Sequence, residues 1–301
     1  MKLPSVAILS AVWNESAHID EMIESLRAQT HRDWGVYFVD DGSTDETAQI
    51  IEMWAQKDPR VHLVARHEHR GKVAAFNAAY AASNEDLICL LAGDDTLPPD
   101  SLEVRCQALS DVDPHTTYAA SWGKLRTFSD NPADDGILMP RGKEPSRSGA
   151  AGALTRALAD LIFPIPEQLP NEDTWLTICA QELAGIDRPL TKVVANYRLH
   201  SGNTSPRRLP FDEFFAMQAR RGEVWRLLAE EPRLPFGKSA RERIARFQAL
   251  EEARRRKSLL GIARVPGVPV LYKAADAWKA NPVLYKIRWS NYRLFNGWLK
   301  A

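Results

Sequence analysis

The chain has 301 residues, of which 45% are hydrophobic and 26% charged. This composition is that of a folded globular protein, so it excludes a disordered chain, and the length fits one large α/β domain with a smaller appendage. The net charge of zero hides an asymmetry: residues 233–301 hold 16 Lys or Arg and 4 Asp or Glu, which leaves 23 basic and 35 acidic residues in the first 232. The acidic part suits a metal ion, and the basic tail suits an anionic membrane surface or an acidic partner.

Short apolar runs and helical patterns alternate through the first hundred residues. Strands are expected at 6–12, 36–39, 61–65 and 87–91, and helices at 16–29, 45–56, 72–82 and 99–109. This alternation predicts right-handed crossovers and a mostly parallel sheet flanked by helices, in which ligands bind beyond the carboxyl ends of the strands. Polar segments follow three of the strands, at 13–15, 40–42 and 93–95, and are therefore expected to converge on one edge.

The pattern loosens after residue 110. We expect a strand at 118–127, a loop at 129–149 rich in Asp, Pro and Gly, a helix at 172–183, a strand at 190–198 and mainly helices from residue 211.

The cysteines and the N-terminus indicate the compartment. Cys89, Cys106 and Cys179 are far apart in apolar patterns, which predicts buried free thiols in a reducing compartment and neither a disulfide framework nor a zinc site. The N-terminus has no cleavage-type site, and no window of about 20 residues is apolar enough to span a membrane. We therefore expect a cytoplasmic protein, placed at the inner face of the membrane if the tail binds lipid, and no nucleic-acid partner.

Adjacent acids end two of the strands. Asp40 and Asp41, in VDDGSTD, can accept hydrogen bonds from a base or a ribose. Helix capping accounts for Ser43, Thr44 and Asp45, but not for the two adjacent acids at the end of an apolar strand. Asp94 and Asp95 follow LICLLAG, where adjacent buried carboxylates repel each other and a hard divalent cation would relieve the repulsion; an acidic turn before a helix is the alternative.

Three later segments have both functional and structural interpretations. Gly71 and Lys72 begin a helix that contains Asn77, where an N–H and an ammonium can meet an anion, although a surface lysine is equally expected. Glu172 and Asp173 begin another helix, where acids suit the helix dipole or provide a general base. The segment YRLHSGNTS places Arg198 and His200 after a strand, suited to phosphate or metal, whereas a lone histidine is usually structural. The histidines and arginines at 66–70 face the same choice between phosphate and solvent.

Together, these segments resemble the inverting family 2 glycosyltransferases of the GT-A fold, in order and in spacing, over residues 5–205. The matching segments are VAILSAVWNE, VDDGSTDET, HRGKVAAFNAAY, LICLLAGDDTLPPDSL, NEDTW and YRLHSGNTS. The resemblance implies a Rossmann-like α/β catalytic domain over residues 1–208, followed by a helical, basic, amphipathic region over 209–301.

The same resemblance implies a role for each matching residue. Asp173 would be the catalytic base, Asp41 or Asp40 would bind the nucleotide base, and Asp94 would contact the ribose or the metal. Asp95 would be the main ligand of Mn²⁺ or Mg²⁺, with His200 in support. The donor-binding residues would be Val12, Trp13, Asn14, Glu15, Asp40, Asp41, Gly71, Lys72, Asn77, Asp94 and Arg198.

The implied reaction transfers a sugar from a nucleotide-diphosphate donor, with a UDP-sugar favoured, to a hydroxyl of a saccharide or lipid-linked saccharide in cell-surface polysaccharide synthesis. The metal motif is Gly-Asp-Asp without the outer acid of a full Asp-x-Asp, and no QxxRW motif is present, so we expect a single-addition enzyme. The loop 129–149 either closes over the donor or is an idle surface loop. A non-catalytic sugar-nucleotide-binding module is the alternative; a nucleotidyltransferase would carry a Gly-rich basic loop after its first strand, which AVWNESAH lacks.

The tail combines basic and aromatic residues. Residues 236–260 predict a basic helix, and a Pro-Gly break follows at 266–269. The final segment carries Tyr285, Trp289, Tyr292 and Phe295 at helical spacing among Lys and Arg. This pattern is typical of a helix at a membrane interface, and packing on the catalytic domain is the alternative.

Overall fold

A computed structural model describes residues 2–200 and 209–290, the side chains of 289 and 290 excepted. The chain divides into two compact units, Met1–Thr204 and Ser205–Ala301. Most of the LHSGNTS segment, and the expected aromatic positions Tyr292 and Phe295, lie outside the described residues.

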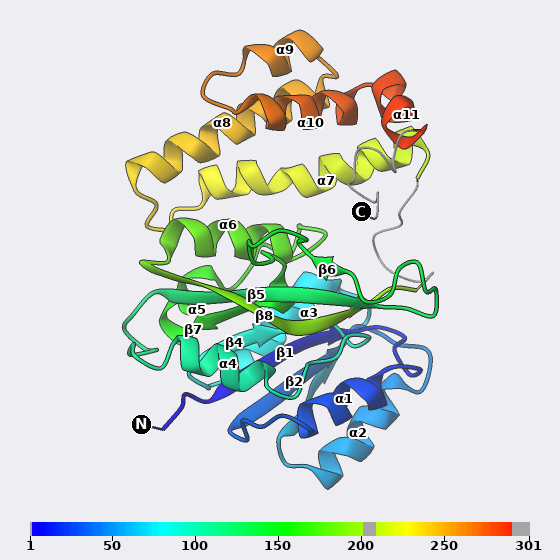
Figure 1. Cartoon of the computed structure of the whole chain (residues 1–301), viewed down its shortest axis with the longest axis vertical. Coiled ribbons are helices and arrows are strands. Elements are labelled where there is room, and N and C mark those ends of the chain that lie inside the picture. The colour runs from blue at the N-terminus through cyan, green and yellow to red at the C-terminus, as the bar shows by residue number, and fades with distance from the viewer. Residues whose placement is uncertain (1, 201–208, 291–301) are drawn as a thin grey trace. The chain divides into compact units, whose positions relative to one another are not determined.

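The first unit is built on one eight-stranded sheet with the order β3-β2-β1-β4-β7-β5-β6, and β8 pairs with β5 (Figure 1). The pairs β1–β2, β2–β3, β1–β4 and β5–β8 are parallel, whereas β7 runs antiparallel to β4 and β5, and β6 runs antiparallel to β5. The predicted mostly parallel sheet is therefore confirmed. The strands are β1 (Val6–Val12), β2 (Trp34–Asp40), β3 (Val61–Arg66), β4 (Leu87–Leu90), β5 (Ala119–Phe128), β6 (Leu138–Met139), β7 (Gly152–Thr155) and β8 (Ile186–Arg198).

Helices cover both faces of this sheet. The side chains Ile8, Phe38 and Cys89 pack in one core with residues of α1, α2 and α4, because alternate residues of a strand point to the same face. Helix α3 contacts β1, β2 and β3, and its Tyr80 stacks on Phe163, which follows α5. The helices are α1 (Ile19–Arg27), α2 (Thr47–Lys57), α3 (Lys72–Ala82), α4 (Ser101–Ala108), α5 (Arg156–Ile162) and α6 (Asp173–Leu183), with a short 3₁₀ turn at Gly149–Ala151.

The main differences from the sequence-based expectation lie at helix starts and in the middle of the chain. The first helix begins at Ile19 rather than at residue 16, and the second at Thr47 rather than at 45. The cap expected at Ser43 or Thr44 is wrong, because Glu46 occupies the cap position without a capping side-chain bond, and Asp45 Oδ1 accepts the Thr47 N–H at 3.0 Å. Strand β7 and helix α5 were not predicted; both are short, at four and seven residues, and they lack the long periodicity on which prediction depends.

The second unit is helical within the described residues. Its helices are α7 (Phe211–Glu230), α8 (Lys238–Arg255), α9 (Leu259–Arg264), α10 (Val270–Ala280) and α11 (Pro282–Ser290). Arg254 is buried, lies within reach of the carboxylates of Glu251 and Asp276, and donates to the carbonyl of Gln218 on α7. The unit therefore has a charged internal link between α7, α8 and α10.

Two further expectations are answered by the structure. Cys89, Cys106 and Cys179 are buried free thiols, as predicted. No helix among the described residues has both the length and the hydropathy to cross a membrane.

Candidate active site

Three neighbouring parallel strands bring the predicted polar segments to one edge of the sheet. β2, β1 and β4 are adjacent. Asp40 is the last residue of β2 and Asp41 follows it, and the acids at 94–95 follow the end of β4. The loop after β2 is joined to β1 directly, because the Asp41 N–H donates to the carbonyl of Val12 at 2.9 Å. The predicted convergence of these segments is thus present in the fold.

The loops that follow β1 and β2 are joined by side-chain hydrogen bonds. Asn14 has a positive φ of 55°, and its Oδ1 accepts from the Thr44 N–H at 2.8 Å. Its own N–H donates to Ser43 Oγ at 2.9 Å, and Asp40 Oδ1 accepts from the Ser43 N–H at 3.0 Å. Ser43 and Thr44 therefore hold two site loops together instead of capping a helix.

The two acids after β2 have different surroundings. Asp40 is fully buried, and its Oδ2 has no hydrogen bond but lies 3.5 Å from Arg66 Nε. Asp41 is nearly buried, and its two carboxylate oxygens accept the Gly71 N–H at 3.1 and 3.0 Å. Gly71 has a φ of 99°, which a residue with a side chain rarely adopts, so glycine is needed for this N–H to reach Asp41.

The acids after β4 are linked to the end of β8. Asp95 is 2% exposed, and its Oδ1 accepts from the Arg198 N–H at 2.9 Å. Arg198 Nε donates to the Asp94 carbonyl at 2.8 Å, and His200 Nε2 lies 3.0 Å from Asp94 Oδ2. Burial, followed by repulsion from Asp94, raises the pKa of Asp95 well above its ordinary value.

The carboxylates of Asp94 and Asp95 fit a hard divalent cation whose coordination is completed by other ligands. Two adjacent carboxylates, one of them almost wholly buried and electrostatically strained, favour a bound positive charge. Within 2–200 and 209–290, no group of three or more His, Cys, Asp or Glu side chains could hold a metal by itself. A cation here would share one or two carboxylates with substrate phosphates and water, which is the usual mode of Mg²⁺.

The loop between β1 and α1 and the first turn of α1 add His18 and Glu21, which the sequence did not single out, beside the predicted Glu15. The imidazole of His18 lies edge-on to that of His200 at 5.4 Å between ring centroids. Glu21 forms an ion pair with Arg198. Burial, then the charges of Asp94 and Asp45, raise the pKa of Glu15 to about 7. Only the position of α1 beside the ends of β4 and β8 could reveal His18 and Glu21, because neither belongs to a motif.

Glu172 and Asp173 stand next to each other but meet different partners. Glu172 is 3% exposed, and its Oε1 lies 2.9 Å from Lys72 Nζ. Asp173, the first residue of α6, is half-buried, and its Oδ1 accepts from the Gly149 N–H at 2.8 Å. Burial alone would lower the pKa of Lys72, but the charges of Glu172, Asp173 and Asp95 raise it above its ordinary value.

Lys72 therefore places an ammonium between the two predicted parts of the site. The Lys72 ammonium forms an ion pair with Glu172 and interacts electrostatically with the carboxylates of Asp173 and Asp95. Of the two neighbouring acids, Asp173 is the one with solvent access. That difference in accessibility makes Asp173 the acid suited to meet a substrate.

Two further residues predicted to bind the sugar donor differ in whether a ligand can reach them. Trp13 is half-exposed at the rim, with its indole 5.4 Å from the imidazole of His69, so a ligand can reach it. The Asn77 side chain is engaged by the backbone instead: its Nδ2 donates to the Ile165 carbonyl and its Oδ1 accepts the Ile165 N–H, both at 2.8 Å. In this structure Asn77 thus joins α3 to the segment after α5.

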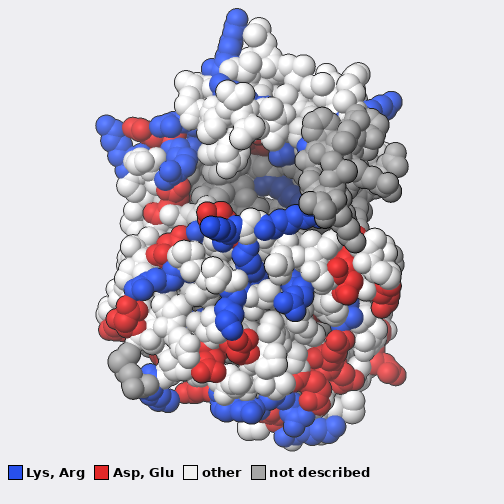
Figure 2. Space-filling view, viewed as in Figure 1, with Lys and Arg blue, Asp and Glu red and all other residues white. Residues whose placement is uncertain are grey.

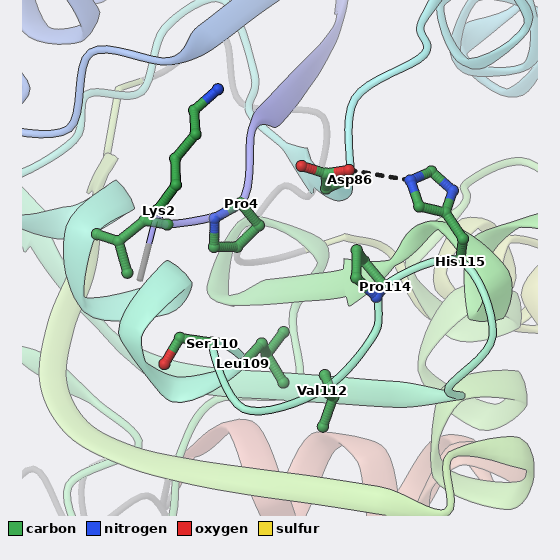
Figure 3. A pocket seen from close by; sticks show the side chains of 9 residues that line it. Lys2, Pro4, Asp86, Leu109, Ser110, Val112, Pro114 and His115 are labelled. Atoms are coloured by element: carbon green, nitrogen blue, oxygen red, sulfur yellow. Dashed lines mark hydrogen bonds and ion pairs between the residues drawn. The ribbon is translucent and has the colours of Figure 1, made fainter.

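A shallow pocket lies at the opposite edge of the sheet (Figure 3). Pro4 and Asp86 precede β1 and β4, and Asp86 Oδ1 lies 3.0 Å from His115 Nε2. Because the predicted site residues follow these strands, this pocket is separate from them. It is lined by Lys2, Leu3, Pro4, Asp86, Leu109, Ser110, Val112, Pro114 and His115.

Gly149 has a close approach that no motif indicated. A Cβ built on Gly149 would lie 2.7 Å from Asp173 Oδ1. With Asp173 as the catalytic base that the resemblance implies, we expect Gly149→Ala to displace its carboxylate and to lower kcat by about 10- to 100-fold, because small misplacements of reacting groups are costly. Steady-state kinetics with a nucleotide-sugar donor measure this change.

Gly142→Ala is the matched control, because a Cβ at Gly142 meets nothing within 4 Å. Gly142 belongs to the loop that follows β6 and Gly149 begins the 3₁₀ turn after that loop, and neither glycine has a positive φ. Equal kcat values for the two variants would contradict a positioning contact between Gly149 and Asp173.

Comparison with known proteins agrees with this geometry. The chain matches the family described as Glycosyl transferase family 2 over residues 7–159, about half of its length. It is 25% identical over 211 residues to the putative teichuronic acid biosynthesis glycosyltransferase TuaG of Bacillus subtilis, covering 67% of this chain and 82% of TuaG. It is 32% identical over 111 residues to the putative glycosyltransferase EpsH of the same species, covering 37% of this chain and only 32% of EpsH.

Solved structures resemble the chain over almost its whole length. S. aureus TarS 1-349 in complex with UDP-GlcNAc has a TM-score of 0.64 at 19% identity, and the match covers 96% of this chain and 92% of that one. The mannosyltransferase PcManGT from Pyrobaculum calidifontis, in complex with GDP-Man and Mn²⁺, has a TM-score of 0.57 at 16% identity, covering 98% and 86%. These similarities show the GT-A fold. With the family match and the motifs at the sheet edge, they establish that the chain belongs to glycosyl transferase family 2.

Proposed function

We propose that this protein transfers a sugar from a nucleotide-diphosphate donor to an acceptor hydroxyl, with inversion at the anomeric carbon. The observation that carries the proposal is the arrangement at the start of α6. There the half-buried Asp173 is held by the Gly149 N–H, while its neighbour Glu172 is engaged by Lys72. One carboxylate is thus fixed in direction, is reachable by a substrate and has no cation of its own at contact distance among the described residues, as a general base requires.

The proposed reaction is a single displacement. Asp173 accepts the proton of the acceptor hydroxyl, whose oxygen bonds to the anomeric carbon on the side opposite the diphosphate. The bond between that carbon and the phosphate oxygen breaks, and the nucleoside diphosphate leaves. Positioning of the two substrates and electrostatic stabilisation supply most of the acceleration.

Asp95, with Asp94 and His200, is the proposed holder of Mn²⁺ or Mg²⁺. A divalent cation bound there would neutralise the diphosphate and make it a better leaving group. Asp41 or Asp40 is the proposed contact for the nucleotide base. Asp41 accepts the Gly71 N–H and lies 3.5 Å from His69 Nδ1, and Asp40 Oδ2 has no hydrogen bond among the described residues.

The donor and acceptor are inferred from chemistry and from the relatives. TarS and PcManGT were solved with UDP-GlcNAc and GDP-Man, and a UDP-sugar remains our favoured donor. TuaG is named for teichuronic acid biosynthesis. ExoO of Rhizobium meliloti, which is 39% identical over 101 residues, is named for succinoglycan biosynthesis. We therefore propose a saccharide or lipid-linked saccharide acceptor in cell-surface polysaccharide synthesis. We assign catalysis to residues 1–208 and propose that the helical part from 209 acts at the inner face of the membrane.

A panel of sugar nucleotides tests this function. We expect one donor to be transferred or slowly hydrolysed in the presence of Mn²⁺ or Mg²⁺, and both turnover and thermal stabilisation by that donor to disappear when EDTA is added. Stabilisation without turnover, for every donor and every saccharide offered, would instead support a binding module with a GT-A fold.

A further inference from the structure

Exposed apolar side chains are concentrated in the last helices of the chain. Seven of the eleven large hydrophobic side chains that are exposed among the described residues lie between 259 and 287. Val270 and Leu271, in the first turn of α10, are the most exposed, at 79% and 83%. Single exposed apolar residues are ordinary on protein surfaces, but a concentration of them in one short region marks an interaction site. The others are Leu259, Leu260, Tyr272, Val283 and Ile287.

These side chains are exposed although the same helices also build a core. Ile262 and Val265 are buried between α8, α9 and α10, and Trp278 of α10 stacks on Phe214 of α7. Helix α10 therefore has an inner side that packs, and in its first turn Tyr272 contacts Phe247 of α8 while Val270 and Leu271 are left exposed. Folding of this unit alone does not account for aliphatic residues in that turn.

The aromatic residue on which the membrane prediction partly rested lies inside this unit. Tyr285 is buried, packs against Phe211 and Phe214, and donates its hydroxyl to the Leu209 carbonyl at 2.7 Å. The structure therefore favours aliphatic residues over Tyr285 as the external apolar surface. The Trp289 side chain and residues 291–301 are outside the described part.

Positive charge surrounds the exposed apolar residues. Residues 256–290 contain seven Lys or Arg and a single acid, Asp276. Asp276 is 3.5 Å from Lys279 and 3.7 Å from Arg254, so its charge is already compensated. Arg264 and Lys286 are exposed, and neither has an ion-pair partner among the described residues. Figure 2 shows a mostly uncharged surface over α9 and α10 with Lys and Arg side chains at its edges.

We propose that α9, α10 and the start of α11 dock on an anionic lipid bilayer, with Val270 and Leu271 inserted among the acyl chains and the lysines and arginines at the headgroups. Aliphatic residues beside Lys suit a lipid interface, whereas protein interfaces are depleted in Lys and enriched in aromatic residues. Helix α10 has 11 residues, about half the length that spans a bilayer, so the contact is peripheral. Membrane docking would bring the enzyme to a lipid-linked acceptor. This reason for docking rests on the proposed function, whereas the docking surface itself does not.

Vesicle sedimentation of the full-length chain tests the proposal. Wild-type protein should bind vesicles of phosphatidylcholine and phosphatidylglycerol in equal amounts, and should bind much less to phosphatidylcholine alone. The double substitution Val270→Glu and Leu271→Glu should weaken binding to the anionic vesicles by about tenfold or more. Both side chains are exposed, so the melting temperature should not change.

Two further variants distinguish insertion of apolar side chains from a nonspecific effect of an added acid and from electrostatic attraction alone. Met53→Glu places an acid on an exposed apolar site of α2, in the first unit, and should bind vesicles like wild type. Arg264→Gln with Lys286→Gln leaves the apolar residues in place and should weaken binding only to anionic vesicles. The proposal is overturned if wild-type protein does not bind anionic vesicles. It is also overturned if the Val270→Glu, Leu271→Glu variant binds them as tightly as Met53→Glu. Donor hydrolysis in solution, measured in parallel, reports on the proposed function separately.

Discussion

Asp173→Asn is expected to lower kcat by about 10²- to 10⁴-fold and to leave the affinity for the nucleotide sugar unchanged, since this is the range that a positioned general base contributes. The amide oxygen of Asn can still accept the Gly149 N–H that Asp173 Oδ1 accepts at 2.8 Å. The fold and the position of the group should therefore be preserved while its basicity is lost. Steady-state kinetics, with donor binding measured by calorimetry, separate the two quantities.

Glu172→Gln is the control that distinguishes the two adjacent acids. Glu172 is buried and lies 2.9 Å from Lys72 Nζ, so its neutralisation removes the partner of that ammonium. We expect a lower melting temperature, with a smaller loss of kcat than in Asp173→Asn. If Glu172→Gln abolishes turnover at an unchanged melting temperature and Asp173→Asn stays active, the base is Glu172. A pure binding module would show no turnover for either substitution to remove.

Asp95→Asn is expected to reduce transfer by about 100-fold or more and to make donor affinity insensitive to Mn²⁺, because a metal at a departing diphosphate contributes several kcal/mol. In EDTA the same substitution should leave the melting temperature unchanged or raise it. Asp95 is 2% exposed beside Asp94, so its negative charge is costly in the folded state. The Asn side chain can still accept the Arg198 N–H. Transfer should thus fall while the melting temperature does not.

Asp45→Asn is the matched comparison at the same edge of the sheet. Burial tends to raise the pKa of Asp45, but hydrogen bonds from Thr47 and Ser16 outweigh it and lower that pKa to about 2. A depressed folded-state pKa stabilises the protein at every pH above the ordinary value of 3.8, and this stability is lost as the pH falls through about 2. At neutral pH, Asp45→Asn should therefore lower the melting temperature. Donor affinity that still responds to Mn²⁺ in Asp95→Asn would contradict the proposed metal position.

The spacing of apolar residues and the local residue types determined the first half of the fold. The apolar run at Val6–Val12 and the helical pattern at Lys72–Ala82 were placed with the observed bounds, because buried parallel strands and long helices leave strong signals. The edge of the sheet at which Asp41 and Asp95 gather also followed from sequence, since carboxyl ends of parallel strands share one side. Strand β7, which lies between β4 and β5 in the sheet, did not follow, because pairing partners depend on contacts far apart in the chain.

Within the site, the sequence determined which residue types are present, and the tertiary structure decided which of them are available. Glu172 and Asp173 are neighbours with the same chemistry. They differ because Lys72 of α3 approaches Glu172, whereas Gly149 of the 3₁₀ turn donates its N–H to Asp173. Asn77 lies in a recognisable motif, yet its amide is bonded to the Ile165 backbone. In the tail, composition indicated apolar and basic residues, but packing buried Tyr285 and left Leu271 in solvent. The physical reason is that burial and hydrogen bonding are properties of neighbours in space, which a linear pattern specifies only where its period is regular.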